Sequence, residues 1–207
     1  MKILVEKEAE DFLEKEGFPL AERKVVNTEE KMLKSAERIG YPLVFKVHSK
    51  KILHKSDVGG VKVDIRNEQE ARKAYKEIIN IKDSEGCLIQ RFIAGDWFLI
   101  GLKKDPTFNH VLAFGMGGIY TEVIKDIALR ICPVSLNEIR KMIKETKSYK
   151  ILKGVRGKKL NIKQVEKLLQ KTSKLAQKYP NIKELDINPL VVNEKEAIAV
   201  DVRIILE

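Results

Sequence analysis

The closing stretch of the chain, residues 184–206, constrains the fold more than any other part of the sequence. It reads ELDINPLVVNEKEAIAVDVRIIL, two runs rich in Ile, Leu and Val around a polar turn. This pattern predicts an antiparallel β-hairpin. Because every strand position in a hairpin has one partner, a turn centred between Glu194 and Lys195 fixes the pairing of all the other residues.

In this register Asn188 faces Asp201, and Asp186 faces Arg203. Side chains alternate between the two faces of a strand, so these four share one face and the apolar residues between them point to the other. Two carboxylates and an amide oxygen suit Mg²⁺, which completes its octahedron with water and substrate phosphates. The alternative is a solvated face with an ordinary surface Asp–Arg pair. A one-residue shift in register would remove the cluster.

The rest of the chain alternates between predicted helices and strands without a linker, a low-complexity tract or an internal repeat. Together these elements predict an α+β protein with two lobes. Ser135 and Asn161 are expected N-caps of two further helices. Periodicity and turn signals predict helices over 6–16, 28–40 and 67–80, and strands over 42–47, 61–65, 86–93, 97–104, 110–115 and 127–134.

Composition argues against several classes of protein. With 43% hydrophobic residues among 207, the chain can bury a core, and no run approaches the roughly 20 apolar residues that span a bilayer. The N-terminus turns acidic within a few residues, unlike a secretory signal, so we expect a cytoplasmic protein with no membrane contact. Cys87 and Cys132 have apolar neighbours and no CxxC spacing, which predicts buried thiols rather than a metal or redox site.

The net charge of +10 favours anionic partners such as nucleotides, phosphates, coenzyme A or nucleic acid. The basic residues are interleaved with Glu along the predicted helices, as expected of solvated faces. Aromatic residues make up only 6% of the chain and do not alternate with basic ones, as a single-strand binding surface would require. We therefore expect no nucleic-acid partner.

Lys46 interrupts the apolar strand predicted at 42–47. A lysine in such a strand must reach solvent or meet an anion, and a nucleotide phosphate would suffice. The alternative is a lysine on an edge strand, where it discourages aggregation.

The segment HKSDVGG begins at His54 and combines residues that suit phosphoryl transfer. Imidazole is nucleophilic near neutral pH, Lys55 would neutralise phosphate oxygens, and Asp57 would fix the imidazole tautomer. The amides of Gly59 and Gly60 would approach phosphate closely. The alternative is a surface histidine in a turn.

Three further features carry less information. His48 and His110 are expected to be surface histidines. The GMGGI run at 115–119 lacks the GxGxxG spacing of a dinucleotide fold and the GKS or GKT ending of a P-loop, so it supports neither phosphate cradle.

The order of motifs along the chain is specific. HKSDVGGV, DPTF, FGMGGIYTEVIKDIALRICPV, ILKGVRG, ELDINPL and AVDVRI follow one another over nearly the whole sequence. This set resembles the ATP-grasp, nucleotide-binding (beta) subunit of ADP-forming acyl-CoA (acetyl-CoA) synthetases, relatives of the succinyl-CoA synthetase beta chain. The resemblance implies a single ATP-grasp domain over 1–207, in which two α/β lobes enclose a nucleotide site. We expect a smaller N-terminal lobe at 18–93 and a C-terminal lobe at 94–207 that carries the metal-binding hairpin.

The resemblance also implies roles for individual residues in nucleotide binding. Lys46 falls on the strand lysine that contacts ATP phosphates, and Gly59 and Gly60 belong to the phosphate-shuttling segment. The hinge that holds adenine through backbone groups corresponds to Gln90, Arg91, Phe92 and Ile93.

The resemblance also implies which residues bind the metal and which residue is phosphorylated. Asn188 and Asp201 fall on the family's magnesium ligands, with Asp186 as their acidic neighbour. His54 falls on the histidine that is transiently phosphorylated, carrying phosphate between a histidine of a partner subunit and the nucleotide.

The implied reaction is acyl-CoA + ADP + phosphate ⇌ acid + CoA + ATP, with Mg²⁺ as cofactor and ATP or ADP as substrate. The sequence has no recognisable CoA-binding module, so the CoA site and the first phosphohistidine are expected on a separate alpha subunit, in an α2β2 assembly.

The chain departs from the family pattern in three places. Gln90, Arg91 and Phe92 stand where QEM is common at the hinge, and Trp97, beside Asp96, stands where a glutamate is usual. These two changes bear on nucleotide affinity. Asn109 replaces the glycine of the DPxFG pattern, a smaller change because Asn tolerates left-handed backbone.

Three other functions remain open. An ATP-grasp ligase that forms an acyl phosphate would need Lys46 and the metal pair but not His54. A non-catalytic regulatory subunit would bind nucleotide without transferring phosphate. A basic RNA-binding domain would show steep salt dependence and indifference to Mg-nucleotide.

Overall fold

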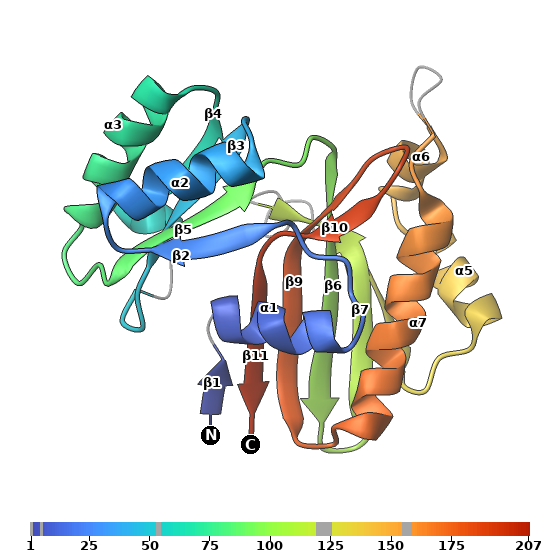
Figure 1. Ribbon diagram of the computed structural model, residues 1–207. Helices are drawn as coiled ribbons and strands as arrows, with labels where there is room; N and C mark the ends of the chain where they lie inside the picture. The colour runs from blue at the N-terminus through green and yellow to red at the C-terminus, as the bar shows by residue number, and fades with distance from the viewer. Residues whose placement is uncertain (1, 5, 53–54, 119–125, 155–158) are drawn as a thin grey trace. The chain divides into compact units, whose positions relative to one another are not determined.

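The computed structural model describes residues 2–4, 6–52, 55–118, 126–154 and 159–207 (Figure 1). The chain forms two compact units, a small unit of residues 21–93 and a large unit of residues 1–20 with 94–207. Residues 18–20, assigned above to the smaller lobe, therefore lie in the large unit. In the described ranges, no helix is both long enough and apolar enough to cross a membrane.

The small unit is a four-stranded antiparallel sheet with helices packed on one face. The order of its strands is β2 (Arg23–Val26), β5 (Gly86–Arg91), β3 (Leu43–His48) and β4 (Val61–Ile65). The helices are α2 (Glu29–Ile39) and α3 (Glu68–Ile79), and a short 3₁₀ turn, η1 (Ser56–Val58), precedes β4.

The two faces of this small sheet have different environments. Phe45 and Val47 of β3, with Ile89 of β5, are buried against α2 and α3. Residues directly opposite each other in an antiparallel pair share a face. The β3–β5 register therefore places Lys46 and Gln90 together on the face away from these helices.

The large unit is built on a seven-stranded antiparallel sheet. Its strand order is β1 (Lys2–Leu4), β11 (Val202–Leu206), β9 (Ile182–Val192), β6 (Asp96–Asp105), β7 (Asn109–Met116) and β8 (Ile127–Ile131), with β10 (Ala197–Ala199) also paired to β9. The helices are α1 (Glu6–Lys15), α5 (Leu136–Glu145), α6 (Tyr149–Lys153) and α7 (Ile162–Lys178), of which α1 and α7 lie against one face of the sheet (Figure 1).

The core of the large unit lies between these helices and the alternate residues of the strands. Phe98 and Phe114 stack with ring centroids 5.9 Å apart, and they pack in one buried cluster with Leu13, Leu169 and Ile187. Burial of such apolar surface is the main force that holds the helices on the sheet.

The predicted helix signals are confirmed. Thr28, Asn67, Ser135 and Asn161 each accept a hydrogen bond from the backbone N–H three residues later, as N-caps do. The helix predicted over 6–16 ends at Lys15, followed by Gly17 with φ of 73°.

The turn between β6 and β7 has the predicted chemistry. The Asp105 carboxylate accepts hydrogen bonds from the N–H groups of Thr107 and Phe108. Asn109 has φ of 67°, the left-handed conformation that its position in the DPxFG pattern predicts.

The register predicted for the closing hairpin is confirmed. Asp186 pairs with Arg203, Ile187 pairs with Val202, and the N–H of Asn188 donates to the carbonyl of Asp201. The return strand is divided into β10 and β11, because regular pairing stops at residues 200–201.

The expectation for two of the histidines was wrong. His110 is buried on β7, with Nε2 2.7 Å from the carbonyl oxygen of Ile182, and His48 ends β3 and is half-buried. Both lie in strands rather than surface turns.

The prediction of buried thiols holds fully for Cys87, which is buried. Cys132 is half-buried at the end of β8, where burial raises the pKa of its thiol.

Candidate active site

Lys46 lies in the interior of the small sheet, since β3 is flanked by β5 and β4. Lys46 is only 5% exposed, and the residues paired with it on the two neighbouring strands are Leu88 and Val61. The edge-strand explanation for this lysine is therefore wrong. A positive charge fixed among apolar residues is a suitable place to receive an anion.

The predicted hinge begins on β5 and leaves the sheet. Gln90 is buried, and Ile93 is also buried at the end of the segment. The N–H of Arg91 donates to Glu22 O, and the N–H of Phe92 donates to Pro42 O. These two amides are engaged by the protein itself, so a base held by this segment would use its other backbone groups.

His54 lies outside the described residues. Of the residues assigned with it, Lys55 is half-buried and Asp57 is exposed in the η1 turn. The structure places both in the small unit, on the connection from β3 to β4.

Gly59 and Gly60 have a defined role in this turn. Gly59 is left-handed, with φ of 67°, and its N–H donates to Ser56 O, while the N–H of Gly60 donates to Lys55 O. A Cβ on Gly60 would lie 2.5 Å from Val47 Cγ1. Both amides are thus hydrogen-bonded within the turn, and their approach to a phosphate stays a prediction.

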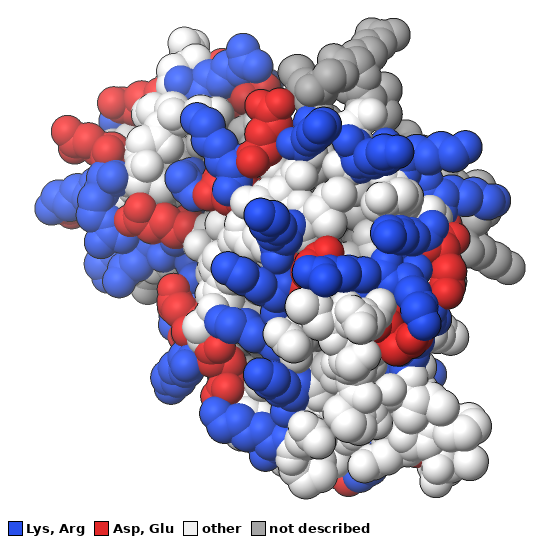
Figure 2. All heavy atoms as spheres, turned by 90° about the vertical axis from the view of Figure 1, so that its right-hand side faces the viewer, with Lys and Arg blue, Asp and Glu red and all other residues white. Residues whose placement is uncertain are grey.

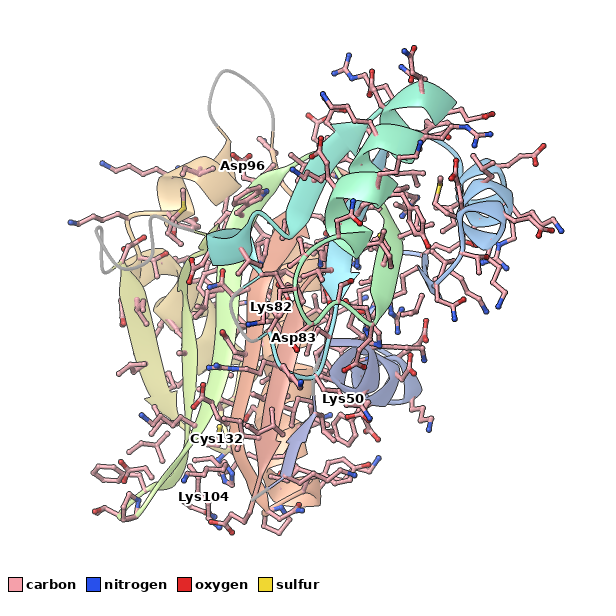
Figure 3. The ribbon with its side chains drawn as sticks, turned by 90° about the vertical axis from the view of Figure 1, so that its left-hand side faces the viewer. Lys50, Lys82, Asp83, Asp96, Lys104 and Cys132 are labelled. Atoms are coloured by element: carbon pink, nitrogen blue, oxygen red, sulfur yellow. The ribbon has the colours of Figure 1, made fainter. Side chains whose placement is uncertain are left out.

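The other end of the connection is anchored by residues that sequence reasoning did not single out. Lys51 Nζ is 3.0 Å from Asp83 Oδ1, and the N–H of Lys50 donates to Glu85 Oε1 at 3.3 Å. The hydrogen bond to Asp83 raises the pKa of Lys51. Figure 3 labels Lys50 and Asp83 in this part of the small unit. The sequence offered no signal for this anchor, because its partners are more than 30 residues apart.

The acidic cluster of the closing hairpin lies in the large unit. Asp186 and Asn188 are half-buried on the face of β9 that points away from the helices, and Asp201, just before β11, is also half-buried. Arg203 pairs with Glu184, with Nη2 2.7 Å from Oε1. The ion pair of Arg203 is therefore with Glu184 and not with Asp186, the partner that the alternative explanation assumed.

Asp186 has the most perturbed environment in this cluster. Burial raises its pKa to about 6; Arg203 opposes the shift, while Glu184 and Asp201 add to it. A carboxylate that is desolvated and surrounded by others is costly to ionise, and a cation beside it would relieve that cost.

A glycine turn closes over the same cluster. The N–H of Gly118 donates to Asn188 Oδ1 at 2.8 Å, and the N–H of Gly117 donates to Trp97 O. A Cβ on Gly118 would lie 2.5 Å from the Trp97 ring, so only glycine fits. Trp97 itself is 44% exposed. The glycine-rich run that resembled no phosphate cradle thus orients a predicted metal ligand.

The donor set of this cluster is one of oxygens. Among the described side chains no group of three His, Cys, Asp or Glu residues could hold a metal, and one of the three predicted ligands is an asparagine. Two carboxylates and one amide oxygen fit a cation that takes its remaining ligands from water and substrate.

Comparison with known proteins places the chain in a family. The family model for an ATP-grasp domain, ATP-grasp_5, matches residues 1–206. The chain is 43% identical to the beta subunit of the ADP-forming acetate–CoA ligase I of Pyrococcus furiosus, over 98% of this chain and 91% of the relative. It is 39% identical to the ADP-forming acetate–CoA ligase I of Archaeoglobus fulgidus, but spans only 30% of that longer protein.

Solved structures agree. An acetyl-coenzyme A synthetase of Ca. Korarchaeum cryptofilum, in complex with coenzyme A and Ca-AMPCP, matches with a TM-score of 0.93 and 38% identity, over 100% of this chain and 94% of that one. The same synthetase with coenzyme A and Mg-AMPPCP, its phosphohistidine segment pointing towards the nucleotide binding site, matches with a TM-score of 0.88 and 39% identity, over 100% and 93%. The chain described here therefore belongs to the ATP-grasp family of beta subunits of ADP-forming acetate–CoA ligases.

Proposed function

We propose that this chain is the nucleotide-binding subunit of an ADP-forming acid–CoA ligase, transferring phosphate between His54 and ADP or ATP. The overall reaction is acyl-CoA + ADP + phosphate ⇌ acid + CoA + ATP. Support comes from the family membership and from the phosphohistidine segment of the Korarchaeum relative, which occurs in a structure with Mg-AMPPCP.

One observation carries the proposal for the nucleotide site. The N–H of Asn188 on β9 donates to the carbonyl of Asp201, the residue just before β11, with Asp186 half-buried nearby and Gly118 hydrogen-bonded to the asparagine side chain. This arrangement fits Mg²⁺, which would be held by Asn188 and Asp201 with Asp186 nearby. Bound there, Mg²⁺ supplies charge neutralisation for the phosphate oxygens of the nucleotide.

Lys46 of the small unit is the residue that we assign to the nucleotide phosphates. Its ammonium, fixed on an interior strand, offsets negative charge on the transferred phosphoryl group, and its burial limits competition from water. Gln90 lies on the same face of the sheet and begins the segment assigned to adenine.

The transfer itself breaks and makes one bond. A nitrogen of the His54 imidazole attacks the γ-phosphorus of ATP through its lone pair, the bond to the bridging oxygen breaks, and ADP leaves with that electron pair. In this step Lys55 would neutralise oxygens of the phosphohistidine, and Asp57 would hold the second ring nitrogen.

The rest of the reaction requires a second protein. The Archaeoglobus relative is more than three times as long as the region matched here. We infer that a separate CoA-binding alpha subunit supplies the remainder, in a cytoplasmic α2β2 assembly.

The test is incubation of the purified chain with Mg-ATP, followed by intact-mass analysis and peptide mapping for acid-labile, base-stable phosphate. The expected result is phosphate on His54 and none on a His54→Asn variant. His48→Asn is the matched control, because His48 lies in the same unit and should leave phosphorylation unchanged.

Two outcomes would contradict the proposal. Full acid–CoA ligase activity of the His54→Asn variant with the alpha subunit would favour a ligase that works through an acyl phosphate. Nucleotide binding without phosphorylation, even when the alpha subunit is present, would favour a regulatory subunit.

A further inference from the structure

Strand β8 is one of the two outermost described strands of the large sheet, and one of its faces is apolar and exposed. Ile127, Leu129 and Ile131 alternate along it and are 42%, 58% and 52% exposed. The residues opposite them on β7 are small or apolar, namely Gly115, Ala113 and Val111. The exposed strip formed by Ile127, Leu129 and Ile131, with the residues opposite them on β7, therefore carries no charge.

The hydrogen bonds of β8 show which backbone groups face outward. The N–H of Cys132 donates to His110 O at 2.8 Å, and the carbonyl of Asp126 accepts from the N–H of Met116. In an antiparallel pair such bonds occur at every second residue, so the even-numbered residues of β8 bond to β7. The N–H and C=O groups of the odd-numbered residues point to the outer edge, where no described strand pairs with them.

The sequence of this edge is symmetric. In IALRI, Leu129 stands at the centre with an isoleucine two residues to each side. If a second copy of the strand pairs antiparallel about Leu129, Ile127 of each copy faces Ile131 of the other, and the two leucines face each other. All six apolar side chains then share one face, and the outward backbone groups find partners.

We propose that β8 is a self-association surface, on which a second copy of this chain adds its own β8 antiparallel to form a continuous sheet. A strand edge fits another strand because it offers alternating donors and acceptors, and the palindromic pattern fits this strand in particular.

The one charged residue of the strand is compatible with this pairing. Arg130 points to the other face, where its guanidinium binds Glu138 and Glu145 of α5. It also donates to Leu129 O through Nη1. In the paired strands, Leu129 O would accept a hydrogen bond from an N–H of the second strand in place of Arg130. Both ion pairs of Arg130 would be kept.

The surroundings of the strip support a protein contact. Phe108, in the turn that precedes β7, is 51% exposed. Figure 2 shows uncharged side chains gathered in one lower area of a surface that is otherwise dense with Lys, Arg, Asp and Glu. Exposed apolar strips of this kind are typical of interaction sites.

The test measures the mass of the full chain in solution by sedimentation and light scattering over a range of concentrations. We expect a concentration-dependent dimer of about twice the 23.7 kDa chain mass. Leu129→Asp should weaken the dimer by about tenfold or more. The matched control is Val63→Asp, because Val63 is 61% exposed on β4, the outer strand of the other sheet, and should leave the dimer unchanged.

A second variant tests the register without disrupting the interface. In a Cys132→Ser background, Leu129→Cys places two thiols at the symmetry centre, where opposed Cα atoms are about 5.5 Å apart and within reach of a disulfide. Oxidation should give a covalent dimer, whereas Val63→Cys in the same background should not. A wild-type chain that is monomeric at every concentration, or a dimer that survives Leu129→Asp, would overturn the proposal.

Discussion

Lys46 in the small unit and Asp186 in the large unit are two buried or half-buried charged groups that the fold holds in opposite ways. In the small unit, Lys46 is set on an interior strand, buried by the sheet that also forms the hydrophobic core. In the large unit, Asp186 lies among other carboxylates on the sheet face away from the helices, and burial opposes its ionisation. Lys46 is therefore held in place by the fold of the small unit alone, whereas the acidic cluster of the large unit would be stabilised by a bound cation.

Removal of the Lys46 charge should have the largest effect. Lys46→Met keeps the length of the side chain and its apolar stem, so the small unit should remain folded. The rate of His54 phosphorylation by Mg-ATP should fall about 100-fold or more, because a buried charge acts on the transferred group. Isotope incorporation over time measures this rate.

Lys62→Met is the matched control for that variant. Lys62 lies on the adjacent strand β4 in a partly exposed pair with Glu77, 2.6 Å away. Its loss should leave the phosphorylation rate within about twofold, since surface pairs contribute little. Equal losses in both variants would mean that net charge, rather than the buried position, matters.

The Asp186→Asn variant tests the acidic cluster of the large unit through its effect on the free energy of unfolding. The pKa of Asp186 is higher in the folded chain, about 6, than its ordinary 3.8, so the folded state binds the proton more tightly. Its contribution to the free energy of unfolding is therefore greatest below pH 4 and falls as the pH rises to about 6. The variant should gain stability over the wild type across this range, by up to about 3 kcal/mol at pH 7.

Chemical denaturation at several pH values checks this difference. At pH 7, millimolar Mg²⁺ should reduce the difference in unfolding free energy between the variant and the wild type, because it stabilises the wild type and has less effect on the variant. A difference that does not change with pH would show that Asp186 is not the group that titrates.

Substitution of Asp201 should have a smaller and more specific effect. Asp201→Asn keeps the shape and the hydrogen bond from Asn188 N–H to its backbone carbonyl. The Mg²⁺ concentration that gives half-maximal nucleotide binding should rise about tenfold, because a charged ligand is lost. Calorimetric titration with ADP at fixed Mg²⁺ concentrations measures it, with Glu184→Gln as the control on the same face of β9.

The smallest effect is expected at Asn109, which is distant in sequence from both Lys46 and the acidic cluster of the large unit. Its φ of 67° disfavours a β-branched residue, so Asn109→Val should reduce the free energy of unfolding by about 1 kcal/mol. Asn109→Gly should be nearly neutral. Neither should alter the Mg²⁺ midpoint; a shift would mean that the loss at Asp201 reflects stability of the large unit.

The features predicted from sequence were those that local rules determine. The register of Asp186 with Arg203 followed from the position of the turn alone, and the caps at Ser135 and Asn161 followed from residue type. The left-handed Asn109 followed from a motif. In each case the interacting groups are close in sequence or joined by one hairpin.

The features that sequence reasoning missed depend on contacts between distant segments. Nothing local in the chain shows that β3 lies between β5 and β4, so the interior position of Lys46 stayed open between two explanations. His110 was misassigned because its burial depends on β9, more than 70 residues later. The short strands β1 and β2 lack a periodic pattern and were not predicted.

The hydrogen bond from Gly118 to Asn188 has a consequence for spectroscopy. The amide oxygen of Asn188 has two lone pairs, and one is occupied by the Gly118 N–H at 2.8 Å. A cation on the other lone pair would withdraw electron density from the same oxygen and lengthen this bond. The nitrogen-15 resonance of Gly118 should therefore move on titration with Mg²⁺, which makes a backbone atom of the glycine turn an internal indicator of metal occupancy.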